Sequence, residues 1–135
     1  MQLLNRIFSK NTAGTDVIRL AVCAILFTHG SYRLYSGSAP KLGALLTEEG
    51  FPAGVVLSYL VCLAETGGTL LMAMRFLVWP VAFTLCLTLF TGILLFQRHV
   101  GFFVIGPHTD GWEYSALLMT CLLVTAWENR TRKFV

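Results

Sequence analysis

Four long apolar stretches dominate this chain and restrict it to a small set of folds. They cover approximately residues 15–35, 52–74, 76–97 and 112–128. A helix that crosses the hydrocarbon layer of a membrane needs roughly 20 mostly apolar residues. Only 13% of the residues are charged, against about 25% in ordinary soluble domains. The pattern predicts an all-α membrane protein, in which residues 1–135 form a single bundle of four transmembrane helices.

Local sequence signals support the ends of these helices. Pro52 suits the first turn of the second helix, and Pro80 lies near the start of the third, where its missing N–H costs little. Asp110 and Glu113 have the spacing of a capping box at the start of the fourth helix. The fourth stretch is the shortest of the four.

The distribution of Lys and Arg predicts the orientation of the bundle. Cytoplasmic ends of membrane helices are enriched in these residues. One side of the bundle would carry Arg6, Lys10, Arg75, Arg130, Arg132 and Lys133, and the other only Arg33, Lys41 and Arg98. Both termini are therefore expected in the cytoplasm, and the loops 36–51 and 98–111 on the outer side. Residues 41–48 of the first loop favour a short helix at the membrane surface.

Two classes of function receive no support from the composition. The basic residues form no stripe with interleaved aromatic residues, so nucleic-acid binding is not expected. The four cysteines occur singly, without a C-x-x-C pair and without metal-type spacing to histidine, so neither a local redox dithiol nor a metal site is expected.

Two ionisable residues fall well inside the predicted membrane spans. Measured at about 1.5 Å per residue, Arg19 and Glu65 lie at nearly the same depth, roughly 20 Å below the outer ends of the first two helices. Charged groups inside a membrane are paired or functional. We expect a buried Arg19–Glu65 ion pair that holds the two helices in register, with proton or substrate handling as the alternative. Ala64 and Gly68 would let the neighbouring helix approach.

A second polar group gathers at the outer surface. His29 and Arg33 are four residues apart and share a helix face, Glu113 begins the fourth helix, and His99 and His108 lie in the loop above. Each has a simpler explanation: a hydrogen bond between helices for His29, a carboxylate at a helix N-terminus for Glu113, and solvated surface for the loop histidines. Together they suggest an outward-facing pocket for a polar headgroup, such as a quinone carbonyl, or for a small anion.

Three motifs give the chain a family resemblance. The first helix contains Arg19-Leu20-Ala21 and then Thr28-His29-Gly30-Ser31-Tyr32-Arg33-Leu34. The second contains Ala64-Glu65-Thr66-Gly67-Gly68-Thr69-Leu70-Leu71, and the fourth opens with Gly111-Trp112-Glu113-Tyr114-Ser115-Ala116-Leu117-Leu118. In order and spacing the chain resembles the DoxX family of small bacterial inner-membrane proteins. The position of Arg33 often holds Lys in that family, which keeps the charge but changes the shape of the donor.

The resemblance implies a multi-pass protein of the bacterial inner (cytoplasmic) membrane, associated with membrane oxidoreductases such as a thiosulfate to quinone oxidoreductase. The first hypothesis is therefore a membrane subunit of a quinone-linked oxidoreductase system, with quinone as a candidate cofactor and none assigned. The alternative is a non-catalytic accessory protein that holds a partner protein. Expected partners are the lipid bilayer and another membrane or redox subunit. Catalytic residues, enzymatic activity and assembly into a homo-oligomer stay open.

Overall fold

The computed structural model describes residues 13–105 and 111–130, and every regular element within these ranges is helical. Three of the described helices are long and apolar enough to cross a membrane. The first is α2 (Ala13–Tyr35). The second, Gly54–Ala73, is continuous through α4 (Gly54–Leu63), the π-helical segment η1 (Ala64–Gly68) and α5 (Thr69–Ala73). The third, Val78–Gln97, joins α6 (Val78–Gly92) to the π-helical segment η2 (Ile93–Gln97).

Two further helices complete the described structure. The amphipathic helix α3 (Ala39–Glu48) folds back onto α4, and it covers the predicted short helix at 41–48. The last helix, α7 (Glu113–Asn129), has 17 residues and packs along α6 and against α2. At this length α7 is shorter than the three candidate spans.

The helix ends lie close to those expected from the sequence. The helix α2 begins two residues before the expected start at residue 15, and the second and third helices each begin two residues later than expected, at Gly54 and Val78. The fourth begins at Glu113, one residue later. Asp110, the other half of the expected capping box, lies outside the described residues.

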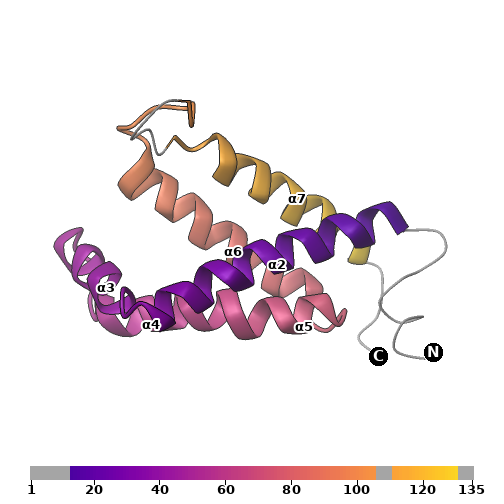
Figure 1. Ribbon diagram of the computed structural model, residues 1–135, viewed down its shortest axis with the longest axis horizontal. Helices are drawn as coiled ribbons and strands as arrows, with labels where there is room; N and C mark the ends of the chain where they lie inside the picture. The colour runs from indigo at the N-terminus through magenta and orange to yellow at the C-terminus, as the bar shows by residue number, and fades with distance from the viewer. Residues whose placement is uncertain (1–12, 106–110, 131–135) are drawn as a thin grey trace.

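The long helices form two layers, which Figure 1 shows clearly. The helix α2 lies on the α4–α5 helix, and α6 lies beside α7. Buried apolar side chains from both layers meet in one core: Val22, Leu26, Met72, Leu85 and Leu122. Many large apolar side chains remain on the outside, as expected of a protein whose solvent is lipid.

A tight turn connects α5 to α6 at the end of the molecule where α2 begins. Arg75 and Leu77 in this turn have positive φ angles of 63° and 50°, a conformation that side chains larger than glycine rarely adopt. The turn reverses the chain within a few residues and directs Arg75 towards Asp16 of α2. The reversal makes α5 and α6 antiparallel neighbours.

Candidate functional site

A cavity of about 430 Å³ lies between the two layers. Its lining is mainly apolar and comes from all the long helices together with α3: Leu46 from α3, Val61 from α4, Leu87 from α6 and Leu118 from α7 are examples. Ligand sites are commonly cavities of this kind, apolar and lined by a few polar groups that orient the ligand.

Arg33 and Glu65 form an ion pair in the wall of the cavity. The Nη1 atom of Arg33 lies 2.9 Å from both carboxylate oxygens of Glu65. The Glu65 side chain is buried, whereas the Arg33 side chain is 27% exposed. One guanidinium nitrogen makes both hydrogen bonds, and within the described residues the other two guanidinium nitrogens make none. Arg33 therefore neutralises the buried carboxylate and can still donate hydrogen bonds to a ligand.

Gly30 brings the two helices close enough for this pair to form. A Cβ atom added to Gly30 would lie 2.7 Å from the Cβ of Glu65 and 3.2 Å from the carbonyl oxygen of Cys62. No side chain fits at this crossing point. Gly68, by contrast, approaches Val81 of α6, so the small residue that allows the pair is on α2.

The π-helical segment η1 carries Glu65 at its start. A π-helical turn leaves backbone carbonyls without their usual partners and often marks a functional site. Here the hydroxyl of Thr69 donates to the carbonyl oxygens of Glu65 and Thr66, at 2.6 and 2.9 Å, and the hydroxyl of Thr66 donates to Cys62. The threonines stabilise the irregular turn that holds Glu65 at the cavity.

His29 lies one helical turn before Arg33 and lines the same cavity. It also lines an open groove on the outer face of α2, together with Arg33 and Tyr32. His29 and Arg33 were expected in one pocket from their spacing, and the structure brings them together there.

A second pair of polar side chains lies on the facing wall of the cavity. Ser115 of α7 is buried, and its hydroxyl donates to the Oε1 atom of Gln97, at the end of η2, over 3.0 Å. Both residues line the cavity, as does Tyr114. Gln97 and Ser115 were not predicted as site residues, because neutral polar residues at helix ends are common and carry no charge signal.

Two of the remaining expected site residues, Glu113 and His99, are described by the structure and lie away from the cavity. The Glu113 carboxylate accepts a hydrogen bond from the backbone N–H of Val104 over 2.9 Å, and it thereby ties Val104 to the start of α7. His99 is exposed and contacts the Arg98 side chain. Neither residue lines the cavity. His108 lies outside the described residues.

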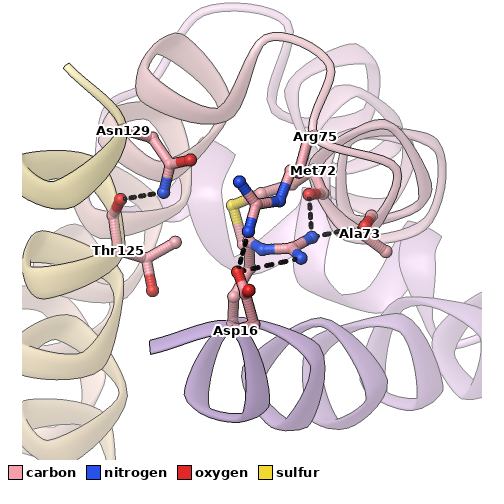
Figure 2. Close-up of polar contacts among 7 residues, drawn as sticks. Asp16, Met72, Ala73, Arg75, Thr125 and Asn129 are labelled. Atoms are coloured by element: carbon pink, nitrogen blue, oxygen red, sulfur yellow. Dashed lines mark hydrogen bonds and ion pairs between the residues drawn. The ribbon is translucent and has the colours of Figure 1, made fainter. Parts of the chain in front are cut away.

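A separate ionic cluster closes the opposite end of the molecule, and Figure 2 shows its geometry. The Asp16 carboxylate accepts hydrogen bonds from Arg19, at 3.4 Å, and from Arg75. The Nη1 atom of Arg19 donates to the carbonyl oxygens of Met72, at 2.9 Å, and Ala73. These carbonyls end the α4–α5 helix and carry its partial negative charge. The cluster thus ties the start of α2 to the end of α5.

The expected Arg19–Glu65 pair is therefore wrong, since Glu65 pairs with Arg33 and Arg19 bonds to Asp16 and the end of α5. The depth estimate assumed that the outer ends of the first two helices lie level. Instead Glu65, eleven residues from the start of α4, lies against Gly30, only five residues from the end of α2. The first part of α4 packs on α3. The i, i+3 spacing of Asp16 and Arg19 was the available signal for the true partner.

Comparison with known proteins gives one result that bears on identity. No curated protein matches the chain, and no solved structure matches it. The family model described as DoxX matches residues 14–98, which include Arg33, Glu65 and Gln97. This match covers more than half of the sequence, and the chain therefore belongs to the DoxX family.

Proposed function

We propose that this protein is a membrane subunit of a quinone-linked oxidoreductase system and binds a quinone headgroup or a small anion in the cavity beside Arg33 and Glu65. The observation that carries the proposal is a largely apolar cavity, within the candidate membrane spans, that has an arginine with unused donors in its wall. An apolar cavity suits a hydrophobic ring, and charged or polar donors suit its carbonyl oxygens.

The proposal also covers the membrane topology: the number of crossings and the side on which the termini lie. We take α7 as a fourth crossing, which makes a four-helix bundle with both termini in the cytoplasm of a bacterial cell. In support, α7 packs along α6 for much of its length. Arg75 lies at the same end of the bundle as the start of α2, and excess basic residues favour the cytoplasmic side. The cavity would then open towards the outer side.

His29 is the residue through which the proposal can be tested without disturbing the ion pair. It lines the cavity, whereas Arg33 also neutralises Glu65 and its loss would affect folding. The chain contains a matched control, because His99 is an exposed histidine that contacts Arg98 and does not line the cavity. Comparing His29→Ala with His99→Ala therefore separates an effect on ligand binding in the cavity from any effect of removing a histidine elsewhere.

The experiment is native mass spectrometry of the protein extracted gently from its own membrane. We expect a quinone-sized adduct on the wild type and on His99→Ala, and a strongly reduced adduct on His29→Ala. A wild-type protein that carries no quinone, and binds neither added quinone nor a small anion, would overturn the proposal. If that ligand-free protein were found attached to another protein, the accessory role would replace it.

A further inference from the structure

The cavity presents polar side chains on two opposite walls. Its first wall, which we name the α2 wall, consists of α2 and η1 and carries the Arg33–Glu65 pair. Its second wall, the α7 wall, consists of η2 and α7 and carries the Gln97–Ser115 pair. These walls belong to different layers of the fold, as Figure 1 shows. A ligand in the cavity would therefore have a hydrogen-bonding group on each side.

The Gln97–Ser115 pair leaves hydrogen-bond donors available on the α7 wall. The Ser115 hydroxyl donates to the Oε1 atom of Gln97, which fixes the direction of the amide. The amide nitrogen, with two N–H groups, makes no hydrogen bond within the described part of the chain. The nitrogen is not fully buried, and Gln97 lines the cavity. We therefore expect a ligand in the cavity to reach this nitrogen, with Ser115 positioning it.

We infer that the ligand carries hydrogen-bond acceptors at two opposite ends, one bound by Arg33 at the α2 wall and the other by the Gln97 amide at the α7 wall. This inference rests on the proposed function and narrows its ligand class. A ring with carbonyl groups on opposite carbons, as in a 1,4-quinone, offers one acceptor to each wall. A small anion offers its acceptors around one centre, so the donors of a single wall would suffice for it.

The test compares two soluble probes that differ in the number of carbonyl groups. The first is 2,3-dimethyl-1,4-naphthoquinone, whose substituted ring resists addition of the cysteine thiols. The second is 1-tetralone, which has a similar bicyclic frame and one carbonyl. Binding of each probe to the detergent-solubilised full chain is measured by isothermal titration calorimetry, for the wild type and for the variants below.

Gln97→Met removes both amide donors and keeps the length and apolar volume of the side chain. We expect its Kd for the naphthoquinone to rise about tenfold, the scale of one lost hydrogen bond, while its Kd for tetralone changes less than about twofold. Ser115→Ala should raise the naphthoquinone Kd by a smaller factor, because the amide stays but loses its orientation. Thr91→Val is the control: Thr91 also lines the cavity, but its hydroxyl donates to the carbonyl of Leu87 in its own helix.

The outcomes separate this inference from the proposed function. A quinone-selective loss in Gln97→Met, with Thr91→Val unchanged, supports two-ended recognition. Naphthoquinone binding that survives in Gln97→Met, or a loss that is equal for both probes, overturns the inference and leaves the proposed quinone site in place. A wild type that does not bind the naphthoquinone also overturns it. Circular dichroism of each variant shows whether the helices are intact.

Discussion

A single nitrogen of Arg33 lies 2.9 Å from both carboxylate oxygens of Glu65, and the pair joins α2 to the π-helical segment η1 at the cavity. The geometry gives one buried acid a counter-ion and leaves the rest of the guanidinium available. The same contact sets the relative position of the first two long helices, while the cluster of Asp16, Arg19 and Arg75 holds the opposite end of the molecule.

The first prediction concerns the coupling between Arg33 and Glu65. Glu65→Met should lower the free energy of unfolding by about 1 to 3 kcal/mol, between the values for exposed and fully buried pairs because Arg33 is partly exposed. The double variant Arg33→Met with Glu65→Met should recover part of the loss. The free energy of unfolding is measured in mixed detergent micelles for the wild type, Glu65→Met and the double variant. In the control cycle, Arg19→Met and Glu65→Met should be additive within about 0.5 kcal/mol; coupling there would contradict the structure.

The second prediction concerns the helix crossing at Gly30. Gly30→Val should destabilise the fold by about 1 to 3 kcal/mol, the scale of overpacking, because its side chain would overlap Glu65 and push α2 away from η1. The ion pair would separate, so ligand binding should fall as well. Thermal unfolding and the probe titration measure the two effects. Gly14→Val lies on the same helix with open space around it, and an equal loss there would argue against a special role for the crossing.

The third prediction concerns Asp16, which holds two arginines. Asp16→Asn should cost about 3 to 5 kcal/mol, the scale of breaking a buried ion pair, because Asp16 and Arg19 are almost fully buried. Detergent-induced unfolding measures the loss. Glu48→Gln, at the exposed end of α3, should change stability by less than about 0.5 kcal/mol. An Asp16→Asn protein as stable as the wild type would show that the cluster does not hold the end of the bundle.

The fourth prediction concerns the placement in the membrane. In a background with the four cysteines replaced by alanine, Ser36→Cys should react with a membrane-impermeant maleimide in intact spheroplasts, and Arg130→Cys only after the membrane is opened. Both positions are exposed and lie at the ends of α2 and α7. Labelling of Arg130→Cys from outside would contradict a fourth crossing or cytoplasmic termini.

The sequence alone determined the helical elements of this protein. Long apolar runs leave the backbone little choice in lipid, because a helix satisfies its own hydrogen bonds. The ends of these runs are marked by proline, glycine and charged residues, so the helices were located to within about two residues. The pairing of His29 with Arg33 on one face also followed from local spacing.

The tertiary structure alone decided which polar groups meet. Arg33 and Glu65 are 32 residues apart, and their contact depends on how far α2 is shifted along α4, which the close approach of Gly30 sets. Gln97 and Ser115 are 18 residues apart, and no local sequence pattern predicts their contact. Helix periodicity gives the face of a side chain and its approximate depth, but the shift of one helix along another results from packing. Packing therefore made Arg33, and not Arg19, the partner of Glu65.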